Sequence, residues 1–192
     1  MGFSSLKNVN TGGGTYENPP AGSHLARCYY IVDQGYQETN FNGEAKVSHK
    51  VRIGWELPAE TMSDGRPFAI FENFTASLNE KAKLFAILKA WLGKAPDPET
   101  FDMKSLIGKE SMVSIIHNER GDKVYANLSS VMPVPKGMPV PKAVNEPVFF
   151  DFDQPDKAVF DKLSPKTQEI LRKAQDWADC SAKMNPDESI PF

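Results

Sequence analysis

Cysteine and histidine are scarce in this sequence. It contains two cysteines and three histidines, and none of them has the Cys-x-x-Cys or His-x-x-x-His spacing that is typical of zinc sites. The two cysteines, Cys28 and Cys180, lie far apart and offer no disulfide framework, which fits a reducing cytoplasm. We therefore expect neither a metal nor a cofactor.

Segments that direct a chain into a membrane are also missing. No run approaches the roughly 18 consecutive apolar residues of a membrane span. The first residues, MGFSSLKNVNTGGG, lack the apolar core of a secretory signal. These absences predict a soluble, cytoplasmic protein.

Motifs of common catalytic sites are absent as well. The glycines at 12–14 are not followed by the lysine and helix of a phosphate-binding loop, and no Gly-x-Ser-x-Gly motif occurs. The carboxylates are plentiful but scattered. The sequence therefore predicts a protein that is not an enzyme.

An excess of positive charge is missing too. The chain has 22 basic and 25 acidic residues, a net charge of −3, which by itself argues against a protein that coats a polyanion. Residues 151–192 hold nine acidic and six basic residues and account for all of that excess. Residues 1–150 are neutral overall, so one of their faces can still be basic.

Five strand candidates and one helix candidate follow a flexible arm at residues 1–23, which is rich in Gly, Ser, Asn and Pro. The strand candidates are residues 24–35, 46–57, 67–74, 110–117 and 124–131. The helix is expected from Leu78 to Leu92, with Ser77 and Glu80 as a capping box and Gly93 as its C-cap.

The element order is therefore three strands, a helix and two strands. It predicts a mainly β fold, a five-stranded Greek-key barrel with a helix between strands 3 and 4, which is the OB-fold. The open face of such barrels binds oligonucleotides or oligosaccharides. Other small barrels and α+β sheets share this order. We assign the domain to residues 24–152.

The remainder of the chain is expected to form three segments. Residues 132–147 contain the repeat MPVPKGMPVPK, which excludes helix and predicts a linker or a strap across the barrel. Residues 153–182 form a C-terminal helical segment, whose helix runs from Ser164-Pro165 to about Cys180 and docks on the barrel or on another chain. Residues 183–192 form an acidic tail that we expect to be disordered.

This tail has the composition of a partner-binding segment. Asp187 and Glu188 precede Ile190, Pro191 and Phe192, so that phenylalanine can fill an apolar pocket while its carboxylate meets an arginine. Acidic residues followed by Ile-Pro-Phe resemble the C-terminal tip of bacterial single-stranded DNA-binding proteins. In that family the tip recruits replication and repair enzymes, and it also competes with DNA for the DNA-binding groove. Here two acidic residues replace the family's run of three or more aspartates.

The barrel region carries a second resemblance. Three segments are similar to small bacteriophage-encoded proteins that bind single-stranded DNA. They are His49-Lys50-Val51-Arg52-Ile53-Gly54-Trp55-Glu56-Leu57, Phe71-Glu72-Asn73-Phe74 and Tyr125-Ala126-Asn127. The resemblance covers roughly residues 24–152. It implies a barrel that binds single-stranded DNA.

Binding of single strands without sequence preference needs cations for phosphates and aromatic rings on which bases stack. Alternation in the first strand places Arg27, Tyr29 and Ile31 opposite Ala26, Cys28, Tyr30 and Val32. Similar mixed faces occur on the later strands. The DNA-binding candidates are Arg27, Tyr29, Lys50, Arg52, Trp55, Arg66, Phe71, Asn73, Lys123, Tyr125 and Asn127.

For each candidate a structural role is the alternative. A strand tyrosine or phenylalanine can simply pack, the cations can form a solvated face, and Trp55 falls on the apolar face of its strand.

We predict a protein that coats single-stranded DNA during phage replication or recombination and recruits a polymerase, primase, helicase or nuclease through its tail. Both a monomer and a homo-oligomer are compatible with the sequence. The alternatives are a replisome adaptor that does not bind DNA, and a nuclease or annealing enzyme.

Overall fold

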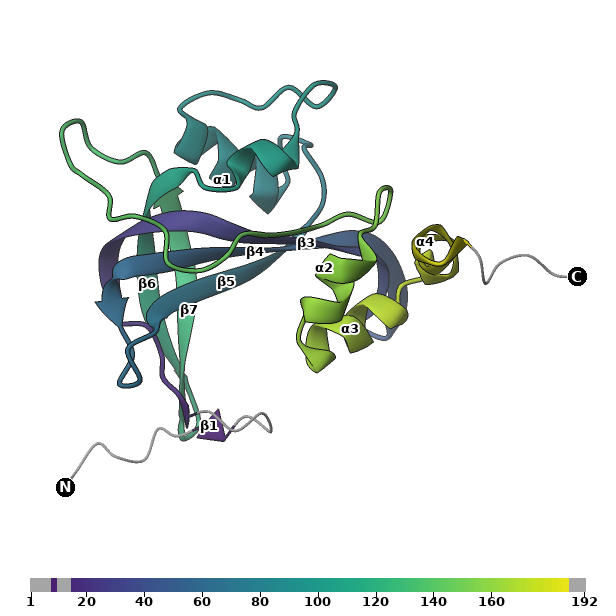
Figure 1. The fold of residues 1–192 in the computed structure, drawn as a ribbon, viewed down its shortest axis with the longest axis horizontal. Coiled ribbons are helices and arrows are strands. Elements are labelled where there is room, and N and C mark those ends of the chain that lie inside the picture. Colours follow the sequence, from purple (N-terminus) through teal and green to yellow (C-terminus); the bar gives the residue numbers. More distant parts are fainter. Residues whose placement is uncertain (1–7, 10–14, 187–192) are drawn as a thin grey trace, which may run out of the picture.

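A six-stranded sheet forms the centre of the fold in the computed structural model, which describes residues 8–9 and 15–186. The five long strands are β3 (Gly22–Phe41), β4 (Glu44–Thr61), β5 (Pro67–Thr75), β6 (Glu110–Arg120) and β7 (Lys123–Met132). They pair antiparallel in the order β5-β4-β3-β6-β7 (Figure 1). The short strands β1 (Asn8–Val9) and β2 (Thr15–Tyr16) pair separately. The prediction of a mainly β fold is confirmed.

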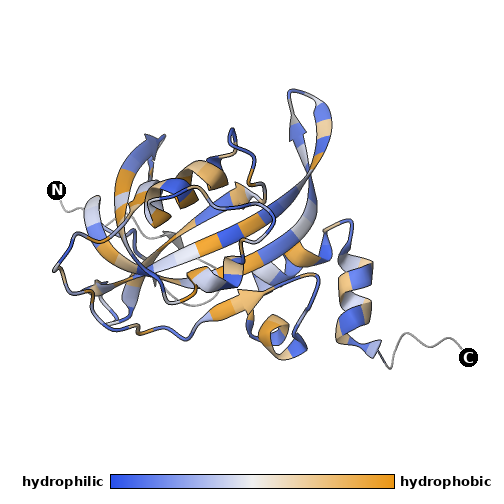
Figure 2. Ribbon diagram, turned by 90° about the horizontal axis from the view of Figure 1, so that it is seen from above, coloured by the Kyte–Doolittle hydropathy of each residue, from blue (hydrophilic) through white to orange (hydrophobic). Residues whose placement is uncertain are grey.

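The strands bury one face as their period-two pattern predicts. On β4, Val51, Ile53, Trp55 and Leu57 are all buried, and Figure 2 shows hydrophobic and hydrophilic residues alternating along the strands. We call the buried side the inner face and the other side the outer face. Even-numbered residues of β4, including Arg52, therefore lie on the outer face.

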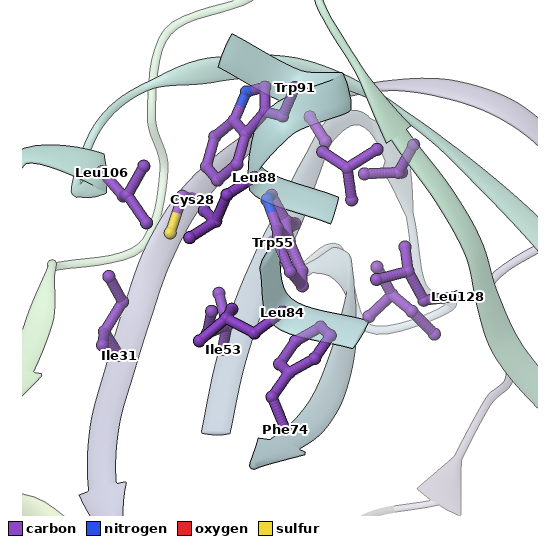
Figure 3. Packing of buried hydrophobic residues seen from close by; sticks show 14 of the residues in the cluster. Cys28, Ile31, Ile53, Trp55, Phe74, Leu84, Leu88, Trp91, Leu106 and Leu128 are labelled. Carbon is purple, nitrogen blue, oxygen red and sulfur yellow. The ribbon is translucent and has the colours of Figure 1, made fainter. Parts of the chain in front are cut away.

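Helix α1 (Lys83–Leu92) covers the inner face. Trp91 packs edge-on against Trp55, with ring centroids 5.8 Å apart (Figure 3). The predicted C-cap at Gly93 is confirmed by its φ of 71°, a conformation that favours glycine. The predicted start at Leu78 is wrong, because Ser77 Oγ accepts from the backbone N–H of Asn79 in a local turn.

The two edge strands of the sheet, β5 and β7, approach each other. Strand β5 contacts β7, and α1 contacts both of them. The 3-10 helix η1 (Met103–Leu106) then leads into β6 and buries Leu106. The inner face is thus enclosed by the curved sheet and α1.

Part of the outer face is covered by the C-terminal quarter of the chain. Strand β8 (Val148–Phe150) pairs parallel with β3, and α2 (Lys157–Lys162), α3 (Pro165–Arg172) and α4 (Trp177–Met184) follow. These elements bury a second core (Val32, Phe150, Phe152, Phe160, Leu163, Leu171, Ala174 and Cys180). Figure 1 shows α1 on one side of the sheet and α2 and α3 on the other.

The single helix predicted from Ser164 to Cys180 is interrupted. It starts as predicted, since Ser164 Oγ accepts from the backbone N–H of Thr167. Between α3 and α4 the chain pairs with β3: the N–H of Gln175 donates to the carbonyl of Tyr36, and the N–H of Tyr36 donates to Asp176. The helix is therefore interrupted where the chain forms hydrogen bonds with β3. No helix of the described ranges is long and apolar enough to cross a membrane.

The proline-rich segment 133–147 is fastened to the outer face at two points. Arg27 donates to the carbonyls of Val140 and Pro141. The buried carboxylate of Glu56 accepts from the N–H groups of Val144 and Asn145 and from the Asn145 side chain, at 2.8–3.0 Å. These hydrogen bonds tie the segment to the sheet. We call residues 133–147 the strap.

Candidate nucleic-acid interface

Aromatic and cationic side chains meet on the outer face of β4 and β5. Arg52 stands opposite Asn73 in the register, and its guanidinium donates to Asn73 Oδ1 at 3.2 Å. Its Cζ lies 4.9 Å from the centroid of the Phe71 ring, which is a cation–π arrangement. Gly54 stands opposite Phe71 and leaves room for the ring. The guanidinium of Arg52 therefore lies over one face of the Phe71 ring.

Two tyrosines of β3 extend this patch. The pairing of β3 with β4 shifts register between Cys28 and Tyr30, and such a bulge re-aims side chains. As a result both Tyr29 and Tyr30 reach the ring of Phe71, with centroids 6.1 and 5.3 Å away. The expectation that Tyr30 lies opposite Tyr29 is wrong, as is the outer placement of Ile31, which is 2% exposed in the inner core. We call Tyr29, Tyr30, Arg52 and Phe71 the aromatic patch.

The two phenols of the aromatic patch stay protonated over the physiological range. Burial raises the pKa of Tyr29, and the nearby carboxylate of Glu56 raises it further. Burial also raises the pKa of Tyr30. Neutral phenols do not repel phosphates, so the net charge of the patch is set by Arg52.

A groove of about 690 Å³ opens beside the patch, a volume within the range of ligand sites. One wall is the sheet, with Tyr30, Arg52 and Phe71, and the other comes from the strap end and helices α2 and α3. The second wall includes Glu146, Pro147, Val148, Val159, Lys162, Leu163, Ser164, Lys166, Thr167 and Ile170. The sheet face and the helices together make a charged, partly apolar groove.

Of the groove lining, sequence reasoning had named only Arg52 and Phe71 as site residues, and it missed Tyr30, Lys162 and Lys166 among others. Tyr30 was assigned to the wrong face because the bulge has no sequence signature. Lys162 and Lys166 lie on elements whose docking position depends on long-range packing. Only the apolar stripe of α3, including Ile170, hinted that this helix covers another surface.

Lys50 and Asn73 lie on the same face as the groove but further along β4 and β5. Lys50 pairs in register with Thr75 and donates to its hydroxyl at 3.0 Å. Lys50, Arg52 and Asn73 therefore continue a polar track along the outer face, as the alternation of β4 predicts.

Three predicted DNA-binding residues have other partners in the structure. Arg27 donates to Glu110 at 2.7 Å and to three backbone carbonyls, and so fastens the strap. Trp55 is 0% exposed in the inner core and is not accessible for base stacking. Arg66 forms two hydrogen bonds with Asp64 in the turn before β5.

The remaining predicted barrel residues lie on β7, at the other edge of the sheet. Lys123, Tyr125 and Asn127 are on one face, with Leu128 buried on the other. Tyr125 is 41% exposed. None of the three lines the groove. The predicted partner-binding residues Asp187, Glu188, Ile190, Pro191 and Phe192 lie outside the described residues.

Comparisons with known proteins do not assign the chain to a family. No family model matches it, and a search of curated proteins found no matching relative. The function is therefore argued from the site.

Proposed function

We propose that this protein binds single-stranded DNA, without strong sequence preference, through the aromatic patch and the groove beside it. The observation that carries this proposal is the contact of Tyr29, Tyr30 and Arg52 with the ring of Phe71 on the outer face, where all four side chains are partly exposed. Bases of any sequence stack on aromatic rings, and each stack contributes about 1–3 kcal/mol. A duplex hides its base faces and would not use such a patch.

The fold that we propose for this DNA-binding protein is the OB-like Greek-key barrel. Three features support it: the strand order β5-β4-β3-β6-β7, the contact between the two edge strands, and a helix that follows β5 and packs on both edges. In such a barrel the third and fifth strands lie side by side and close the sheet. In this proposal β5 and β7 are those two strands.

The proposed setting is phage DNA replication or recombination in the host cytoplasm. Residues 187–192 would recruit replication or repair proteins. This part of the proposal rests on the sequence resemblance of the tail and of residues 24–152. We propose a binding function without catalysis.

Fluorescence anisotropy of a labelled oligo-dT of about 30 nucleotides tests the proposal. If the site neutralises about four to six phosphates, log affinity should fall with log salt at a slope of roughly −3 to −4. A matched duplex should not displace the oligonucleotide, and the labelled strand should stay intact in magnesium. Absence of binding at low salt would overturn the proposal and favour a replisome adaptor, whereas cleavage would favour a nuclease.

Two variants locate the site. Phe71→Ala should weaken binding by about 1–3 kcal/mol, and Arg52→Gln should make the salt slope shallower by about 0.7. Arg66→Gln is the matched control, because Arg66 is already paired with Asp64. Equal effects of Arg52→Gln and Arg66→Gln would place the DNA elsewhere.

A further inference from the structure

We infer that helices α2 and α3 form the second wall of the single-strand site and that Lys162 and Lys166 bind phosphates there. This inference rests on the proposed function and adds a second element of the chain to the site. It assigns a DNA-binding role to a segment that otherwise serves to cover the sheet.

The position of the two lysines carries the inference. Lys162 ends α2 and Lys166 lies in the first turn of α3, and both line the groove that also holds Tyr30, Arg52 and Phe71. Both are exposed. Phosphates of a strand whose bases stack on the sheet would therefore face these two ammonium groups.

Two other cations of the same segment are paired with carboxylates. Lys157 pairs with Asp161 at 3.0 Å, and Lys173 pairs with Glu169 at 2.6 Å. Within the described ranges, neither Lys162 nor Lys166 lies within 4.0 Å of a carboxylate oxygen. Lys162 and Lys166 therefore keep unpaired charges at the groove, whereas Arg172 of α3 donates to Gln168 and lies over the ring of Phe160.

The helical wall is held firmly against the sheet. Phe160 and Leu163 are buried in the second core together with Val32 of β3. The side chain of Gln37, also on β3, donates to the carbonyl of Ile170 at 2.9 Å. Because the helices are already fixed, binding does not lose the conformational entropy that ordering a free loop would cost.

Charge in the groove is positive overall. Arg52, Lys162 and Lys166 face a single acidic residue, Glu146, among the described lining residues. The apolar side chains of Val159 and Ile170 flank the lysines. Such a wall suits a sugar-phosphate backbone, and the aromatic wall suits the bases.

The experiment compares two double variants of the full chain by oligo-dT anisotropy at several salt concentrations. Lys162→Gln/Lys166→Gln should make the slope of log affinity against log salt shallower by about 1.4, since each phosphate contact contributes about 0.7. Affinity near 0.1 M salt should then fall roughly tenfold or more. The control, Lys157→Gln/Lys173→Gln, removes the same charge from the same helices and should keep the slope of the unmodified protein.

A third variant tests the sign of the effect. Glu146→Gln removes the acidic group of the groove and should tighten binding several-fold, with urea unfolding used to confirm that all variants are folded. Equal slopes for the two double variants, with normal loss of binding in Phe71→Ala, would overturn the lysine assignment and leave the proposed function standing. Failure of the unmodified protein to bind oligo-dT would overturn both.

Discussion

Gly54 lies directly beneath the ring of Phe71. A Cβ added to Gly54 would come within 2.5 Å of Cε1 of that ring and 3.0 Å of the Tyr30 Cβ. The Phe71 ring thus packs directly against the backbone of β4. Any side chain at position 54 must push the ring off the sheet.

Gly54→Ala should therefore weaken oligo-dT binding by disturbing Phe71, by up to the 1–3 kcal/mol of one base stack. A double-mutant cycle separates this effect from a general one. In a Phe71→Ala background the extra methyl should cost little further affinity. Additive losses in the anisotropy measurement would show that Gly54 acts independently of the ring.

The buried carboxylate of Glu56 should contribute strongly to stability. It accepts three hydrogen bonds from Val144 and Asn145 of the strap. Glutamine keeps one acceptor oxygen and would turn its amide N–H₂ toward at least one of those donors, so Glu56→Gln should lower the free energy of unfolding by about 1–3 kcal/mol. Urea denaturation measures this loss, and Glu119→Gln, on the exposed part of β6, should change stability by no more than about 0.5 kcal/mol. Similar values for both variants would contradict the anchoring role of Glu56.

A histidine of β4 pairs with β3 inside the β3–β4 hairpin. His49 Nε2 lies 2.6 Å from Asp33 Oδ1 and its ring stacks on Tyr36. The hydrogen bond to Asp33 raises the pKa of His49 above its ordinary value, with the charges of Asp33, Asp176 and Asp153 adding to the effect. Charged His49 therefore stabilises the folded protein.

Because this pKa is raised, the stabilisation is fully present below the ordinary value of about 6.5 and is lost as pH rises through the raised value. His49→Gln should lower the melting temperature at pH 5.5, and its difference from the unmodified protein should shrink toward pH 9. Thermal unfolding across this range measures the difference. A gap that stays constant or widens with pH would exclude the charged pair as its cause.

Residues 187–192 should not be needed for DNA binding. Their deletion removes the acidic side chains of Asp187 and Glu188, so affinity for oligo-dT should stay the same or increase, most clearly at low salt. The full chain should capture replication proteins from a bacterial lysate and the deletion variant should not. Weaker DNA binding after deletion, or unchanged capture, would contradict the role proposed for the tail.

The sequence predicted side-chain faces well wherever a strand is regular. In β4 and β5 the period-two pattern correctly separates Val51 and Phe74 from Arg52 and Phe71. In β3 the same rule fails after Cys28, because one extra residue at the bulge reverses the alternation. The bulge depends on the pairing of two strands and is not encoded in a local pattern.

The C-terminal segment shows a similar limit. Local signals located the start of α3 at Ser164 and Pro165. They gave no sign that the helix would break near Gln175, because the competing partner is the backbone of Tyr36. The contributions of Lys162 and Lys166 to the groove likewise depend on where the helices dock.

The groove is assembled from opposite ends of the polypeptide. Tyr30 lies early in the chain, and Ile170 lies in α3 near the other end. Contacts of such large sequence separation form late and slowly in folding. During synthesis the sheet can form first, but the groove is complete only after α2 and α3 have left the ribosome and packed on β3. A growing chain thus has only one wall of the groove, and the second wall is present only after α3 has packed.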